Sequence, residues 1–134
     1  MLRGPATIMY WAADLPAAKS WYTEVLGMEP YFEVPGYVEF RVGDYQTELG
    51  IADRRYAPDD LGEGPGGAVV HWAVADVEKT LDRLVELGAV VVMPVTERGD
   101  GFVTAAVTDP FDNVLGIMYN RHYLEVVNGR TEPL

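Results

Sequence analysis

Residues 8–27 read IMYWAADLPAAKSWYTEVLG, and residues 70–88 repeat their pattern as VHWAVADVEKTLDRLVELG. Asp14 matches Asp76 at an offset of 62 (76 − 14). Self-similarity of this kind indicates that one structural unit occurs twice in a chain. The repeat therefore decides the fold, because whatever the first copy forms the second copy forms as well.

Each copy predicts a strand followed by a helix. Asp14 and Asp76 stand directly before the helical stretches, where a short carboxylate accepts hydrogen bonds from the first free N–H groups. Apolar residues then recur at three- and four-residue steps, which is the period of an amphipathic helix. Gly27 and Gly88 follow at the position where a helix ends in a left-handed residue.

Three strand-like runs follow each helix, separated by turn residues such as those at 35–36, 43–44 and 98–101. The predicted strands are 28–34, 37–42, 46–52, 90–95, 102–109 and 113–119. We place module one at about 6–53, a linker at about 54–67, module two at about 68–120 and a polar tail at 121–134. Residues 1–134 are thus expected to form a single α+β domain of two tandem βαβββ modules.

The chain is acidic, with a net charge of −11 at pH 7. Phosphate backbones and anionic lipids bind clustered Lys and Arg, which are scattered here, so we expect no nucleic-acid or membrane partner. The absence of cysteine excludes disulfides, thiolate metal sites and a Cys nucleophile. No stretch approaches the roughly 20 apolar residues that span a bilayer, and the first residues lack a signal-peptide core. These features favour a cytoplasmic protein.

The element order resembles the vicinal-oxygen-chelate superfamily, which includes glyoxalase I, bleomycin-resistance proteins and extradiol dioxygenases. The matching motifs are ADL at 13–15, WY at 21–22, LG at 26–27, ADV at 75–77 and LGA at 87–89. Residues 107–116, VTDPFDNVLG, are similar to the family's closing Asp-Pro-x-Gly-Asn segment, with Asp112 in place of the usual Gly. The resemblance implies a curved, cup-like mixed sheet with its helices outside and a ligand inside the cup.

In the metal-dependent members of the family, a His on the first strand and a Glu on the last strand of each half hold a divalent ion. These positions fall on Thr7 and Glu48 in the first half, and on Val69 and Gly116 in the second. One remaining carboxylate does not hold a divalent ion at useful affinity. We therefore expect no family-type metal centre and no cofactor.

His71 and Glu48 are the candidate catalytic residues. His71 lies two residues beyond Val69 and shares its face of the strand, because side chains alternate along a strand. A His titrates near neutral pH, and a carboxylate in an apolar cup has a raised pKa that suits proton abstraction. The alternative is a buried neutral His and an ordinary strand Glu that faces water.

Strand side chains supply the candidate ligand contacts. Met9 aligns with His71 in the repeat and is expected to face the cup, so Tyr10 and Trp72 are expected to pack on the helices. Strand aromatics can also be plain core or dimer interface, and residues 53–56 either grip an anionic ligand or form a solvated loop. The candidate ligand-binding residues are Met9, Trp11, Glu48, Tyr56, His71 and Phe102.

The missing metal ligands favour a binding protein that sequesters or recognises a hydrophobic or aromatic compound without a metal. An alternative is a metal-independent lyase or isomerase that uses Glu48 and His71 for acid–base chemistry. A metal-dependent glyoxalase or dioxygenase with a shifted site is a third possibility. The resemblance also implies a homodimer, and the apolar closing strand at 114–119 would suit its interface.

Overall fold

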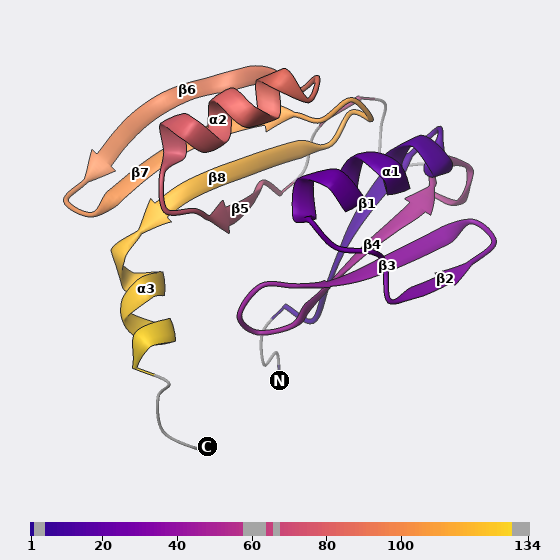
Figure 1. The fold of residues 1–134 in the computed structure, drawn as a ribbon, viewed down its shortest axis with the longest axis horizontal. Coiled ribbons are helices and arrows are strands. Elements are labelled where there is room, and N and C mark those ends of the chain that lie inside the picture. The colour runs from indigo at the N-terminus through magenta and orange to yellow at the C-terminus, as the bar shows by residue number, and fades with distance from the viewer. Residues whose placement is uncertain (2–4, 58–63, 66–67, 130–134) are drawn as a thin grey trace. The chain divides into compact units, whose positions relative to one another are not determined.

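The computed structural model describes the whole chain except residues 2–4, 58–63, 66–67 and 130–134. The chain divides into two compact units, residues 1–64 with 111–113 and residues 65–110 with 114–134. Each unit contains one four-stranded sheet and a helix packed on it (Figure 1). The element order confirms the predicted α+β fold of two tandem βαβββ modules.

The first unit forms a mixed sheet in the order β1-β4-β3-β2. Its elements are β1 (Thr7–Ala12), α1 (Leu15–Leu26), β2 (Phe32–Val34), β3 (Tyr37–Val42) and β4 (Thr47–Asp53). The β1 strand runs parallel to β4, and the other pairs are antiparallel. Residues 28–31 were expected to be strand, but regular pairing begins only at Phe32, because Glu29-Pro30 interrupts the run.

The caps of α1 are those predicted from the repeat. The Asp14 carboxylate accepts a hydrogen bond from the Ala17 N–H at 3.1 Å, and Gly27 ends the helix with a φ of 68°. Such a side-chain cap typically stabilises a helix by about 1 kcal/mol. The helix packs on β1, β3 and β4, and its Tyr22 ring lies 5.8 Å from the ring of Tyr10. Tyr10 therefore belongs to the core, as expected.

Residues 111–113 belong to the first unit although they come late in the chain. The Asn113 side chain accepts a hydrogen bond from the Trp11 N–H at 3.3 Å and donates one to the Trp11 carbonyl at 3.0 Å. Asp112 before it has a φ of 70°, in the left-handed region where Asp is tolerated better than most residues. The amide thus pairs the free edge of β1 as a neighbouring strand would.

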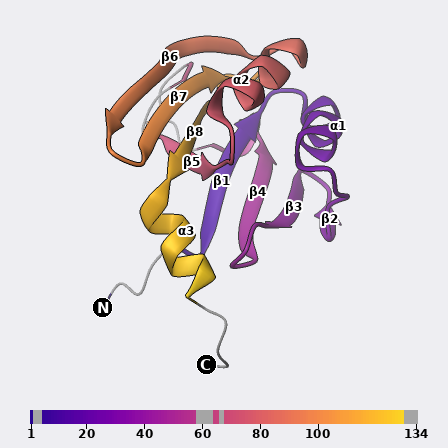
Figure 2. The same ribbon diagram turned by 60° about the vertical axis from the view of Figure 1, so that its left-hand side comes forward.

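The second unit forms a mixed sheet in the order β5-β8-β7-β6. Its elements are β5 (Val70–Ala73), α2 (Val77–Glu86), β6 (Val90–Gly99), β7 (Phe102–Thr108) and β8 (Val114–Asn120). The α2 helix contacts β6, β7 and β8 and lies along this sheet (Figure 2). Asp76 caps it by accepting from the Lys79 N–H at 3.0 Å, and Gly88 follows with a φ of 101°.

The β6 strand is longer than predicted. It continues to Gly99, so the predicted turn at 98–101 narrows to Asp100-Gly101. Three register shifts interrupt its pairing with β7, and such bulges let a strand continue past Pro94 while bending. Arg98 therefore lies on the sheet and not in a turn.

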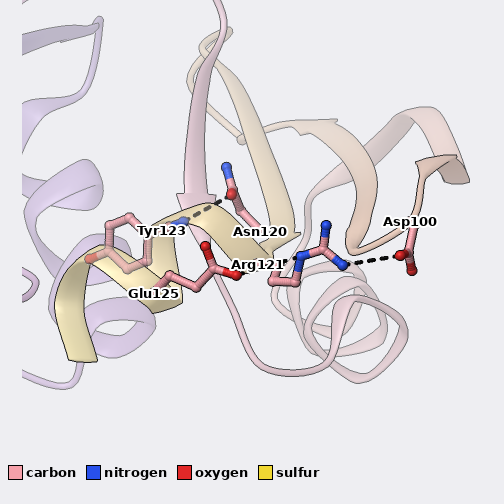
Figure 3. A network of polar contacts seen from close by, with 5 residues as sticks. All are labelled: Asp100, Asn120, Arg121, Tyr123 and Glu125. Carbon is pink, nitrogen blue, oxygen red and sulfur yellow. Dashed lines mark hydrogen bonds and ion pairs between the residues drawn. The ribbon is translucent and has the colours of Figure 1, made fainter. Parts of the chain in front are cut away.

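The predicted tail begins with a helix, α3 (Arg121–Asn128). Figure 3 shows its start: the Asn120 side chain accepts from the Tyr123 N–H at 3.0 Å, and Arg121 pairs with Asp100 at 3.1 Å and with Glu125 at 3.7 Å. The predicted polar tail at 121–134 therefore contains a capped helix, and residues 130–134 lie outside the described part. Neither α3 nor any other described helix is long and apolar enough to cross a membrane.

The predicted linker also begins with structure. Residues Arg54–Tyr56 form a short 3-10 helix, η1. The Asp53 side chain caps it by accepting a hydrogen bond from the Arg55 N–H at 3.0 Å. The rest of the predicted linker falls largely on residues 58–63 and 66–67, outside the described residues.

Candidate functional site

Each sheet has one face packed on its helix and one opposite face, which we call the open face. Strand alternation separates the two, since buried residues such as Leu49, Ile51 and Ile117 lie on the helix side. The open face of the first sheet carries Thr7, Met9, Trp11, Tyr37, Glu39, Arg41, Glu48, Gly50 and Ala52. The open face of the second sheet carries His71, Phe102, Thr104, Ala106, Gly116 and Met118.

The predicted site residues fall into two groups. Met9, Trp11 and Glu48 share the first open face, whereas His71 and Phe102 share the second. Trp72 lies opposite the buried Ile117 on the helix side, as expected.

Tyr56 is the candidate that joins neither group. It follows β4 and is 62% exposed. Its ring packs against Gly36 in the β2–β3 turn, and the Arg55 guanidinium lies 5.2 Å from the centre of that ring.

Glu39 is the centre of a polar cluster on the first open face. The hydroxyls of Tyr31 and Tyr37 each donate a hydrogen bond to one of its carboxylate oxygens. Burial raises the pKa of Glu39, and the nearby Glu48 carboxylate raises it further. Burial and Glu48 also raise the pKa of Tyr37, so each group keeps its proton to a higher pH than it ordinarily would. We call Tyr31, Glu39 and Tyr37 the Tyr–Glu–Tyr cluster.

Glu48 lies on the same face, one row further along the sheet. Its register partners are Thr7 on β1 and Arg41 on β3, and the Thr7 hydroxyl donates to its carboxylate at 3.0 Å. The Arg41 guanidinium stands 4.2 Å from the centre of the Tyr31 ring. The first open face therefore combines two carboxylates, two phenols and a stacked guanidinium.

Gly50 gives this cluster its space. A Cβ atom built on Gly50 would lie 2.8 Å from Cε1 of Tyr37 and 2.9 Å from the Met9 sulfur, and would also collide with the Tyr37 hydroxyl. Ordinary carbon contacts are about 3.5–4.0 Å, so only glycine allows these two side chains to meet across β4.

The second open face has small residues in the middle of its sheet. The registers place His71, Gly116, Ala106 and Met93 in one row across β5, β8, β7 and β6. A Cβ atom on Gly116 would lie 2.8 Å from the His71 ring, which therefore leans over β8. The middle of the row is formed by two small residues, and His71 and Met93 stand at its ends.

The registers also show which positions are counterparts in the two modules. Met9, the counterpart of His71 in the repeat, lies opposite Gly50, as His71 lies opposite Gly116. Gly50 is therefore the counterpart of Gly116, and equating Glu48 with Gly116 by spacing is wrong by two residues. Paired strands define the counterparts, whereas distances counted along the chain include turns of different length.

The residues at the family's metal positions do not fit a divalent ion. Thr7 already donates its hydroxyl to Glu48, and Val69 is apolar. Gly116, and Val114 two residues before it where the registers place the counterpart of Glu48, have no side-chain donor atom for a metal. Within the described residues, no three His, Asp or Glu side chains gather as a metal site would require. A family-type metal centre therefore does not fit this donor set.

A hollow of about 370 Å³ lies on the helix side of the first sheet. It is lined by Leu15, Pro16, Lys19, Gly36, Val38, Asp53 and Arg55. Its two basic side chains already have carboxylate partners, since Lys19 pairs with Glu33 at 2.6 Å and Arg55 with Asp53 at 3.2 Å. The open faces therefore remain the better candidates for chemistry.

Sequence reasoning missed Glu39 and Arg98. Glu39 could have been found from alternation, because Tyr37, Glu39 and Arg41 share one face of a strand whose other face is Val38, Phe40 and Val42. Arg98 left no such signal, because two glycines and an aspartate beside it are typical of a turn.

Residues 4–117 match the family described as the Glyoxalase/Bleomycin resistance protein/Dioxygenase superfamily. The chain belongs to this superfamily. A search of the curated proteins found no match.

Solved structures share the fold at low sequence identity. A glyoxalase-related enzyme from Fulvimarina pelagi matches with a TM-score of 0.72 and 24% identity over 89% of each chain. A lactoylglutathione lyase from Agrobacterium tumefaciens matches with a TM-score of 0.67 and 21% identity, over 88% of this chain and 94% of that one. A glyoxalase/bleomycin resistance protein/dioxygenase from Nocardioides matches with a TM-score of 0.66 and 17% identity, over 100% of this chain and 91% of that one.

Proposed function

We propose that this superfamily member binds a small hydrophobic or aromatic compound on its open faces, and sequesters or recognises it without a metal. The observation that carries the proposal is the group of exposed apolar side chains around the Tyr–Glu–Tyr cluster. Met9 is 40% exposed, Tyr31 44% and Phe32 46%. Exposed apolar groups gathered beside a few convergent polar groups are typical of ligand sites.

The polar cluster supports selectivity within such a site. The Glu39 carboxylate and the two phenols that donate to it offer a ligand both hydrogen-bond acceptors and hydroxyl groups. The surrounding rings supply contact area, with Phe32 and Tyr37 centroids 6.4 Å apart. A flat compound with one polar substituent would meet both kinds of contact.

A second candidate function is metal-independent proton transfer, as in a lyase or isomerase. The observation that favours it is again Glu39, since a carboxyl of raised pKa beside a phenol suits general acid–base chemistry. The version with Glu48 and His71 requires one substrate to reach the open faces of both sheets. Turnover lost in Glu39→Gln with binding intact would support the enzyme over the binding protein.

We further propose a homodimer that works in the cytoplasm. The support for a dimer is β6, an edge strand whose residues Val90 and Val92 are 62% and 54% exposed. An exposed apolar edge strand readily pairs with another chain. Gel filtration should give a particle of about twice the 14.8 kDa chain, and elution as a 14.8 kDa species would remove this proposal.

Elemental analysis combined with native mass spectrometry tests the proposed function. Protein purified without chelator or His-tag should contain no stoichiometric metal and should carry, or take up, an organic adduct of small mass. Near-stoichiometric Zn, Ni, Mn or Fe would contradict the metal-free proposal.

A further inference from the structure

Arg98 is held on the open face of the second sheet by neutral groups. Its Nε donates to the Thr104 hydroxyl at 3.1 Å, and its Nη2 stands 3.0 Å from the Met93 sulfur, a weak acceptor. Thr104 and Ala106 lie two residues apart on β7 and share a face. The guanidinium therefore lies over the same face as the row from His71 to Met93.

Arg98 has no carboxylate partner among the residues that the structure describes; its side-chain contacts are to Thr104 and Met93. By contrast, Lys19, Arg55, Arg83 and Arg121 each pair with a carboxylate. A guanidinium presents a planar fork that matches a carboxylate. The contacts to Thr104 and Met93 leave the Nη1 hydrogens of Arg98 for such a group.

His71 approaches the same place from the other edge of the sheet. The side chain is exposed, and its ring leans over Gly116 on β8, while Arg98 reaches from β6 over Thr104 on β7. Gly116 pairs with Ala106, and Thr104 lies two residues from Ala106 on β7. Neighbouring strands are about 4.8 Å apart, so His71 over Gly116 and Arg98 over Thr104 are separated by roughly one strand spacing and two residues along the strands. Between them lie the small side chain of Ala106, which is 3% exposed, and Gly116, which has no side chain.

We propose that the part of the second open face around Gly116 and Ala106, flanked by His71, Thr104 and Arg98, binds the carboxylate of an aromatic or apolar organic acid. Arg98 supplies the charge and the planar fork, and a ring N–H of His71 supplies a hydrogen bond from the opposite side. This inference rests on the proposed function, because it assigns a chemical class to the bound compound.

The test compares two probes of the same shape, 2-naphthoate and its neutral amide 2-naphthamide, by titration calorimetry on the full chain. We expect 2-naphthoate to bind about tenfold more tightly, since hydrogen bonds to charged groups are stronger than neutral ones. The preference should disappear in Arg98→Gln and be reduced in Arg98→Lys, which keeps the charge but loses the fork. Arg83→Gln, an exposed arginine on α2, is the matched control and should keep the preference.

Each result separates this inference from the proposed function. Equal binding of the two probes, or a preference that survives Arg98→Gln, would overturn the carboxylate site while leaving a binding protein. If Arg83→Gln also abolished the preference for 2-naphthoate, the preference would reflect the overall charge of the protein, and the carboxylate site would be overturned as well. If the wild type binds neither probe, both the carboxylate site and the binding of flat aromatic compounds fail.

Discussion

The two sheets have matching helix sides and contrasting open faces. On the helix side, Ile51 and Ile117 are counterparts, both nearly fully buried. On the open side, the first sheet carries Glu39 among tyrosines, whereas the second carries Arg98 and His71 above small residues. The two open faces thus contrast in charge, since the first carries two carboxylates beside Arg41, whereas the second carries Arg98 and His71. Core packing constrains the helix side of each repeat, while the open side is free to differ, so function has to be sought there.

The largest effect should come from the matched core pair. Ile51→Ala and Ile117→Ala should each lower the free energy of unfolding by about 2–5 kcal/mol, because each removes buried methyl groups and leaves a cavity. Urea unfolding of the two variants measures this. A loss at one position and none at the other would show that the two helix sides are not equivalent.

The next effect tests the side-chain pairing at the β1 edge of the first sheet. Asn113→Ala should cost about 1–3 kcal/mol, since it leaves the N–H and carbonyl of Trp11 without their amide partner. The matched control is Asn128→Ala at the exposed end of α3, which should change stability by less than about 0.5 kcal/mol. Equal stability of the two variants would mean that the amide does not secure the β1 edge.

The third prediction concerns the charge contrast itself. Glu48→Gln should lower the pKa of Glu39, because it removes a carboxylate that raises it. A raised pKa in the folded state means that the fold is favoured at low pH and loses stability as the pH rises from the usual glutamate pKa of about 4.3 through the folded value. Glu39→Gln should therefore flatten this fall in stability.

Carboxyl-carbon NMR titration of Glu39 measures the shift directly. Glu86→Gln, an exposed change on α2, is the control and should leave the Glu39 titration unaltered. An unchanged Glu39 pKa in Glu48→Gln would show that the two carboxylates on the first open face do not interact.

The smallest effect is expected at the edge of the first open face. Thr7→Val removes a hydrogen bond to Glu48 that is exposed to water, so stability should fall by about 0.5 kcal/mol. Thermal unfolding checks this value, and a loss beyond about 2 kcal/mol would mean that the pair is more important to the fold than its exposure indicates.

The fold could be predicted from the sequence because its signals are local and occur twice. Asp14, Asp76, Gly27 and Gly88 each mark a helix end through the geometry of one or two hydrogen bonds. Alternation placed Met9 and Tyr10 on the correct faces. Helix α3 was missed because its cap, Asn120, is also the last residue of β8, so no turn residues separate the strand from the helix.

The candidate site was harder to predict. The Tyr–Glu–Tyr cluster brings together neighbouring strands whose register depends on a two-residue turn at Pro35-Gly36. The position of Arg98 depends on register shifts in β6, and Pro94, the one proline in that strand, does not indicate the shift between Glu97 and Gly99. Both features arise from pairing between strands, and spacing along one strand does not reveal them.

Methionine methyl NMR tests the central claim that the open faces bind a small aromatic compound. Met9 and Met93 stand on or beside the two open faces at 40% and 39% exposure, and Met28, at 38%, lies outside both sheets. Titration of methyl-labelled protein with 2-naphthol, a flat neutral probe, should shift the Met9 or Met93 signal and leave Met28 in place. Equal shifts at all three, or no shift at Met9 and Met93, would contradict the account.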